Sequence, residues 1–120
     1  MVKTKVGSQS VALFYCGDKD MRRGTTPTHV FTPDIDVSEA TVMYITYQQN
    51  NETVLEKTIE DVTFNEDGTF SVTLTQAETL AFEEMARVEI QIRVKFPDGS
   101  AVGSEIVRSN ADRILKDGEI

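Results

Sequence analysis

The sequence contains one cysteine and one histidine, Cys16 and His29, and these two side chains are the first candidates for chemistry. A catalytic thiol needs a general base beside it, and His29 is the only histidine that could supply one. Nothing in the spacing links the two residues, and Cys16 follows the apolar run 11–15, where it reads as a small hydrophobic residue. One His and one Cys also fall short of a structural zinc site. We therefore expect neither nucleophilic catalysis nor a bound metal.

Closely spaced carboxylates occur at 18–20, 34–36 and 83–84, and they are the other candidates for catalysis or cation binding. None of them lies in the twelve-residue pattern of a calcium loop, and adjacent residues rarely face one pocket. The glycines are scattered, so there is no phosphate-binding loop. We interpret these carboxylates as solvated loop residues, and the sequence predicts no catalytic residue, no metal and no cofactor.

The unusual local feature is the segment 22–31, which places two arginines, a glycine and a proline directly before an expected strand. Two interpretations remain open. The segment is either a rigid turn that leads into the strand, which we favour, or an arm that docks on acidic groups of a neighbouring protein. In the second interpretation the docking residues are Arg22, Arg23, Thr25 and His29.

Charge and hydropathy exclude two further classes of function. The chain has 12 basic and 20 acidic residues, a net charge of −8, so its field repels nucleic acid. No apolar stretch approaches the roughly 20 residues that span a bilayer, so we expect no membrane partner. A single cysteine rules out an internal disulfide framework, and we expect the protein to be made in the cytoplasm.

The positioning elements are indicated by period-two alternation, which is clearest between Val88 and Phe96. Five apolar residues alternate there with four polar ones, so a strand places all the apolar side chains on one face. The turn 97–100, with sequence PDGS, follows directly, and the run 101–109 is expected to return as the partner strand of a hairpin.

A second strand is predicted over 41–48, and both of its faces carry apolar or aromatic residues. Val42 and Tyr44 share one face, while Met43, Ile45 and Tyr47 share the other. Such a strand is either central in its sheet or presents one face to a partner, and Tyr44 and Tyr47 are therefore further docking candidates. Turns at 49–52 and 65–68 lead into strands at 53–59 and 70–75.

One segment departs from the β pattern. Thr75 is followed three residues later by Glu78, which is the spacing of a capping box at the start of a helix. Leu80 and Phe82 do not continue an amphipathic stripe, so we expect one or two helical turns near 76–82 between two strands.

About seven short strands with regularly spaced turns predict an all-β protein, an immunoglobulin-like antiparallel β-sandwich with one short helical turn. Residues 1–20 are expected to form an N-terminal arm or an extra strand, and residues 21–120 the sandwich domain. The predicted core consists of Phe31, Ile45, Leu55, Phe70, Val72, Leu74, Leu80, Val88, Ile90, Ile92 and Val94.

The stretch 21–31 (MRRGTTPTHVF) resembles the start of small structural proteins of phages and prophages of Gram-positive bacteria. Those proteins often open with an RGTTPTH signature soon after the initiator methionine, which places residues 1–20 ahead of the family's start. Further similarity lies at 42–49, 72–80 and 88–94, so the resemblance spans about 21–118. Less closely, the opening is similar to the N-terminal immunoglobulin-like domain of upper baseplate proteins. The resemblance implies a tail or baseplate component and assigns no catalytic residue.

Together these observations favour a non-catalytic structural protein of a phage or prophage particle, which assembles through protein–protein contacts. Its expected partners are other phage structural proteins and further copies of the chain, and its expected location is the assembled virion. Edge strands and exposed aromatics would make the contacts. The alternative is a carbohydrate-binding or host-recognition module, which the absence of tryptophan disfavours. A small enzyme is the least favoured interpretation.

Overall fold

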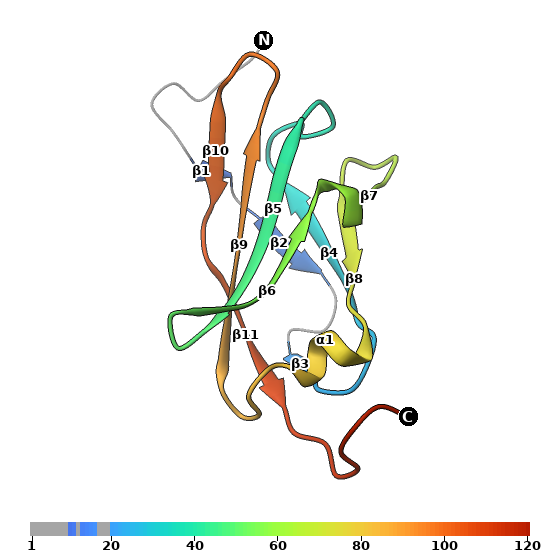
Figure 1. The fold of residues 1–120 in the computed structure, drawn as a ribbon. Coiled ribbons are helices and arrows are strands. Elements are labelled where there is room, and N and C mark those ends of the chain that lie inside the picture. Colours follow the sequence, from blue (N-terminus) through green and yellow to red (C-terminus); the bar gives the residue numbers. More distant parts are fainter. Residues whose placement is uncertain (1–9, 12, 17–19) are drawn as a thin grey trace.

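The computed structural model describes residues 10–11, 13–16 and 20–120, and the side chains from Met21 onward. The chain folds as two β-sheets packed face to face, with one short helix at one end (Figure 1). The predicted all-β sandwich is therefore confirmed. The elements in chain order are β1 (Ser10–Val11), β2 (Leu13–Cys16), β3 (Asp20–Arg22), β4 (Thr28–Pro33), β5 (Val42–Gln49), β6 (Glu52–Thr58), a 3₁₀ turn (Ile59–Asp61), β7 (Thr63–Phe64), β8 (Phe70–Thr73), α1 (Gln76–Leu80), β9 (Arg87–Lys95), β10 (Ala101–Ser104) and β11 (Val107–Asp112).

The larger sheet, which we call the front sheet, is organised around β9. Strand β5 pairs with one edge of β9 and β6 lies outside β5, while β10 and β11 share the other edge of β9. The back sheet has the order β2-β4-β8-β7. Counted along the chain, this is the immunoglobulin arrangement, in which the first, second, fourth and fifth principal strands form one sheet and the third, sixth and seventh the other. Strand β6 is an additional strand between the third and fourth.

Two pairings differ from the purely antiparallel sheets that we expected. Strand β1 runs parallel to β10, and β3 runs parallel to β11, at the outer edge of the front sheet. Strand β2 pairs antiparallel with β4 in the back sheet. The described parts of the first 22 residues therefore contribute to both sheets, which lets the chain cover an edge of each. The rest of the predicted arm, residues 1–9, 12 and 17–19, lies outside the residues that the structure describes.

The alternation predicted for 88–96 is confirmed. Val88, Ile90, Ile92 and Val94 of β9 are at most 4% exposed, whereas Arg87, Gln91, Arg93 and Lys95 are exposed. Nine of the eleven predicted core residues are buried, and Leu55 and Leu80 are only half-buried because they lie at the margins of the sandwich. The prediction missed six buried apolar side chains, namely Met21, Val37, Met43, Tyr47, Phe82 and Ala111.

The predicted turns at 49–52 and 65–68 and the turn at 97–100 are also confirmed. Asn50 and Asn51 form a two-residue hairpin loop with φ angles of 54° and 65°, the left-handed values of a type I′ turn. At the opposite end of the sandwich, Asp67 accepts hydrogen bonds from the backbone N–H and the hydroxyl of Thr69, and Asp98 does the same with Ser100. Hydrogen bonds to the charged form lower the pKa of each carboxyl.

The predicted return strand 101–109 is interrupted, which corrects the sequence-based expectation. Strand β10 ends at Ser104, and β11 begins at Val107. The Ser104 hydroxyl accepts a hydrogen bond from the Ile92 N–H at 3.0 Å and donates one to the Glu105 carbonyl at 2.8 Å. A side chain thus takes a place in the ladder that a backbone carbonyl normally holds, and the strand bends out at Glu105 and Ile106.

The predicted helix and its capping box are confirmed. The Thr75 hydroxyl accepts a hydrogen bond from the Glu78 N–H at 3.1 Å, and the Glu78 carboxylate accepts one from the Thr75 N–H at 2.8 Å. Helix α1 has five residues. Within the part of the chain that the structure covers, no helix is long and apolar enough to cross a membrane.

Candidate functional site

Of the six residues predicted to dock a partner, Arg23 serves the fold itself. Its side chain is only 17% exposed, and its guanidinium donates to the carbonyls of Leu80 at 3.1 Å and Phe82 at 2.8 Å, at the end of α1. Cationic donors stabilise the unpaired carbonyls at a helix C-terminus. The contacts of Arg23 therefore support the first interpretation of segment 22–31, a rigid turn.

The neighbouring residues of the turn complete this attachment. The Gly24 N–H donates to the Thr79 hydroxyl at 2.9 Å, and that hydroxyl donates to the Thr25 carbonyl at 2.9 Å. Gly24 has φ +76°, and a Cβ atom there would lie 3.0 Å from the end of the Ile114 side chain, so any other residue would be strained. Residues 23–25 (Arg-Gly-Thr) thus contact both α1 and the C-terminal segment.

Arg22 and Thr25 are exposed and remain candidates for docking. The Arg22 guanidinium is 59% exposed, donates to the Arg113 carbonyl at 2.9 Å and lies 3.9 Å from the Asp112 carboxylate. The Thr25 hydroxyl donates to the Arg22 carbonyl at 2.6 Å. Ion pairs this exposed contribute little to stability, so a partner could replace them at small cost.

His29 and Tyr47 are not on the surface, which corrects their assignment as docking residues. They are 1% and 0% exposed, and His29 Nδ1 lies 2.7 Å from the Tyr47 hydroxyl. His29 comes from β4 of the back sheet and Tyr47 from β5 of the front sheet, so this hydrogen bond joins the two sheets inside the core. The reason is the pleat, because Tyr47 shares the inward face of β5 with Met43 and Ile45.

Tyr44 occupies the opposite face of β5 and is 44% exposed. Strand register places it beside Arg93 of β9 on one side and Thr58 of β6 on the other. Along the same outward faces follow Thr46 beside Gln91 and Gln48 beside Glu89. We call this outer surface of the front sheet the front face; its members are Tyr44, Thr46, Gln48, Glu56, Thr58, Glu89, Gln91, Arg93 and Ile106.

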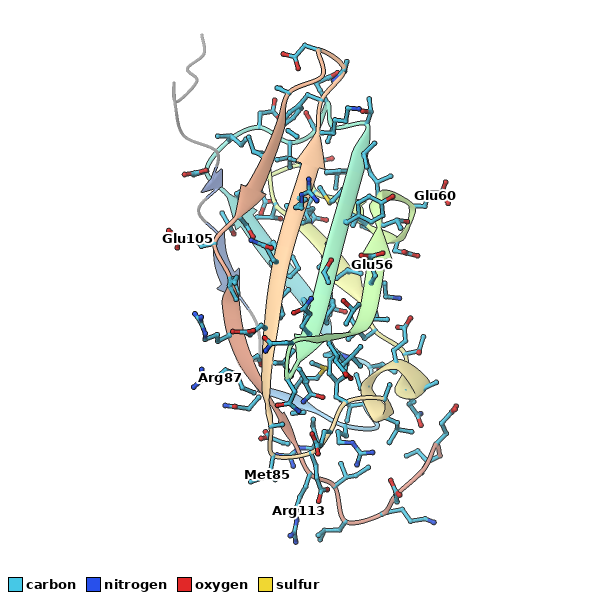
Figure 2. The ribbon with its side chains drawn as sticks, turned by 60° about the vertical axis from the view of Figure 1, so that its left-hand side comes forward. Glu56, Glu60, Met85, Arg87, Glu105 and Arg113 are labelled. Carbon is cyan, nitrogen blue, oxygen red and sulfur yellow. The ribbon has the colours of Figure 1, made fainter. Side chains whose placement is uncertain are left out.

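The front face contains several residue types that are common in protein interfaces. Tyrosine and arginine are enriched in protein interfaces, and amides and hydroxyls supply hydrogen bonds there. A shallow hollow of about 70 Å³ lies within it, lined by Thr46, Gln48, Glu89, Gln91 and Ile106. Ile106 reaches it because the chain bends out between β10 and β11, and this side chain is 42% exposed. Figure 2 shows this side of the molecule, with Glu56 on β6 and Glu105 beside the bend.

The free edge of the front sheet, in contrast, is protected. Strand β6 has a bulge where the register shifts between Tyr47 and Gln48, and its Lys57 points inward. Lys57 is 9% exposed and its Nζ lies 2.6 Å from the Glu78 carboxylate. Bulges and inward-pointing charges prevent strand addition at an edge. Of the two surfaces expected to meet a partner, the front face is therefore better suited than the β6 edge.

Desolvation raises the pKa of Glu78, but the hydrogen bonds from Lys57 and Thr75, together with the charge of Lys57, outweigh it and hold the pKa below its ordinary value. The Glu78 carboxylate thus stays ionised at neutral pH while it caps α1 and pairs with Lys57. The acidic loop residue Asp36 also has a lowered pKa, because the Ser38 N–H and hydroxyl donate to it.

Of the nine front-face residues, only Tyr44 was predicted from the sequence as a docking residue. The prediction missed Thr46, Gln48, Glu56, Thr58, Glu89, Gln91, Arg93 and Ile106. The polar positions of the two strong β patterns, 41–48 and 88–96, already indicated which residues share the outward face. Ile106 could not be assigned, because it was expected inside a regular strand. Among the side chains described, no three His, Cys, Asp or Glu residues lie close enough to hold a metal ion.

No protein-family model matches this chain, and no curated protein sequence matches it either.

Proposed function

We propose that this chain is a non-catalytic structural protein of a phage or prophage particle, a tail or baseplate component that acts through protein–protein contacts. The resemblance of segment 21–31 to such proteins motivates the class. The single observation that supports contact-making is the front face, where Tyr44 stands exposed among hydroxyl, amide and arginine side chains.

The proposed contact surface follows from what the other predicted residues do. Arg23, His29 and Tyr47 are engaged inside the fold, and strand β6 is protected against strand addition by its bulge and Lys57. The front face, in contrast, is not covered by any other described segment, and its Tyr44 and Ile106 are exposed. Partners are other structural proteins of the particle and further copies of this chain, arranged with the symmetry usual in assemblies.

The test is capture of the proteins encoded by neighbouring genes. The purified chain is examined by size-exclusion chromatography with light scattering, alone and after co-expression with each neighbour. We expect a stable complex or a defined oligomer. Tyr44→Lys should lower capture at least tenfold, because central aromatic residues of interfaces are worth about 2 kcal/mol or more.

Thr73→Lys is the matched control, because Thr73 is an exposed strand residue on the outer surface of the back sheet. It introduces the same charge on the opposite side and should leave capture unchanged. A chain that stays monomeric and captures none of the neighbouring proteins would overturn the proposal.

A further inference from the structure

The side chains that line the hollow in the front face include several hydrogen-bond acceptors. Gln91 Nε2 donates to the Ser104 carbonyl at 2.9 Å, and because a carbonyl cannot donate, this contact fixes the orientation of the Gln91 amide. This contact leaves its Oε1 and one amide proton for a ligand. Gln48 Nε2 donates to the Thr53 hydroxyl at 3.3 Å, which likewise leaves Oε1 and one amide proton.

The remaining polar groups are acceptors as well. The Thr46 hydroxyl donates its one proton to the Glu56 carboxylate at 3.3 Å, so only its lone pairs remain. The Glu89 carboxylate lies 3.5 Å from Arg108 Nε, measured at Oε2. The lining thus combines two side-chain amides, a hydroxyl and a carboxylate with the aliphatic side chain of Ile106.

Size and polarity together select the ligand. A hollow of about 70 Å³ has room for about five water-sized groups. A hexose has roughly twice as many non-hydrogen atoms, and it carries no charge to pair with the Glu89 carboxylate. An ammonium group on an aliphatic stem fits both conditions, because it carries three donors and no acceptor and its methylenes can lie against an apolar wall.

We propose that this hollow is the socket for a lysine side chain of a partner protein, with the ammonium held by Gln91 Oε1, Gln48 Oε1 and the Glu89 carboxylate. Its methylenes pack on Ile106, and the partner backbone passes over the front face toward Tyr44. This inference rests on the proposed function, since it identifies the group by which an assembling subunit is recognised. The Glu89 carboxylate is the group that distinguishes a lysine from an uncharged ligand.

The test is an NMR titration of the ¹⁵N-labelled chain with Nα-acetyl-lysine N-methylamide. Nα-Acetyl-norleucine N-methylamide, which has the aliphatic stem but no ammonium, is the matched probe. We expect saturable shifts of the side-chain amides of Gln48 and Gln91 and of the Ile106 N–H, with a dissociation constant of the order of 10 mM for so small a ligand. The norleucine probe should shift these signals at least fivefold less.

Glu89→Gln keeps the shape of the side chain and removes its charge, and it should weaken binding of the lysine probe at least threefold. Glu66→Gln, an exposed turn residue at the far end of the sandwich, should not. Equal shifts with both probes, or saturation by N-acetylglucosamine and not by lysine, would overturn the lysine socket. These outcomes are independent of the capture experiment, because a chain that binds the lysine probe but captures no neighbouring protein would refute the assembly role alone.

Discussion

At the scale of single residues, two buried or half-buried polar pairs connect separate elements through hydrogen bonds, which aliphatic side chains cannot form. His29 and Tyr47 lie between the two sheets, 2.7 Å apart, in the region where antibody domains hold a disulfide and a tryptophan. Lys57 and Glu78 join β6 to α1 at the margin of the core. The first pair holds the sheets together, and the second holds the helix in place.

Removing the Tyr47 hydroxyl should destabilise the protein. Tyr47→Phe takes away the hydrogen bond to His29 in a buried site, and we expect the free energy of unfolding to fall by about 1–2 kcal/mol. Tyr44→Phe is the matched control and should change it by less than about 0.5 kcal/mol, because that side chain is exposed. Urea denaturation measures both. Equal losses would show that the buried bond contributes nothing specific.

Glu78 should make stability depend on pH in a defined direction. Its pKa in the folded chain is lowered, so its contribution is complete above the ordinary value of 4.5 and is lost as the pH falls through the folded pKa. Glu78→Gln resembles the protonated form. It should lower the free energy of unfolding by about 1–2 kcal/mol at pH 7, since Lys57 keeps no charged partner, and by less at pH 3.

Urea denaturation at the two pH values separates these cases. Glu66→Gln should have no effect at either pH, because that carboxylate lies in an exposed turn. A loss from Glu78→Gln that is the same at pH 3 and pH 7 would contradict the role given to its charge.

At the scale of elements, the sequence allowed good predictions where one local pattern decides the structure. The alternation from Val88 to Phe96 and the capping box of Thr75 and Glu78 each specify an element without help from the rest of the chain. The break at Ser104 was not predictable, because it depends on a hydroxyl that bonds to a strand twelve residues earlier. The parallel pairings of β1 with β10 and of β3 with β11 were not predictable either, because the partner strands lie about 90 positions away in the sequence.

The same distinction applies to the candidate site. The two faces of 41–48 were assigned correctly, but only the packed sheets show that the face of Met43 and Ile45 is the inner one, which buries Tyr47. His29 lies just after a proline and a threonine and has no apolar neighbours on its N-terminal side, so its burial is set by the facing sheet. The hollow in the front face was unpredictable because Ile106 reaches it through the break at Ser104.

The attachment of α1 should depend on Arg23 and not on Arg22. Arg23→Met keeps the aliphatic stem and removes the donors to the helix carbonyls, which should cost about 2 kcal/mol. Arg22→Met should cost less than about 0.5 kcal/mol. Thermal unfolding followed by circular dichroism measures the difference. A larger loss for Arg22 than for Arg23 would be inconsistent with the helix contact.

The β5–β6 hairpin should respond to the backbone preference of its second loop residue. Asn51 has φ 65°, so Asn51→Val forces a branched side chain into the left-handed region and should lower the free energy of unfolding by about 1–2 kcal/mol. Asn51→Gly should be neutral or stabilising by up to about 0.5 kcal/mol. Chemical denaturation tests this order, and a more stable valine variant would exclude the assigned turn.

At the scale of the whole molecule, the β6 edge of the front sheet is protected against strand addition, and the front face is the proposed contact surface. The loops at the end opposite α1, at 34–41, 65–69 and 96–100, carry six acidic residues and no basic one, and they contribute to the net charge of −8. The front face combines both charges with tyrosine and amides.

The most direct measurement is photo-crosslinking within the assembled particle or the co-expressed complex. A photo-reactive phenylalanine analogue replaces Tyr44 on the front face in one variant and Thr73 on the back sheet in the other. We expect a crosslink to a second protein from position 44, mapped by mass spectrometry to a peptide that contains a lysine, and none from position 73. Crosslinks from position 73 alone would place the partner on the opposite sheet and contradict the contact surface assigned to this fold.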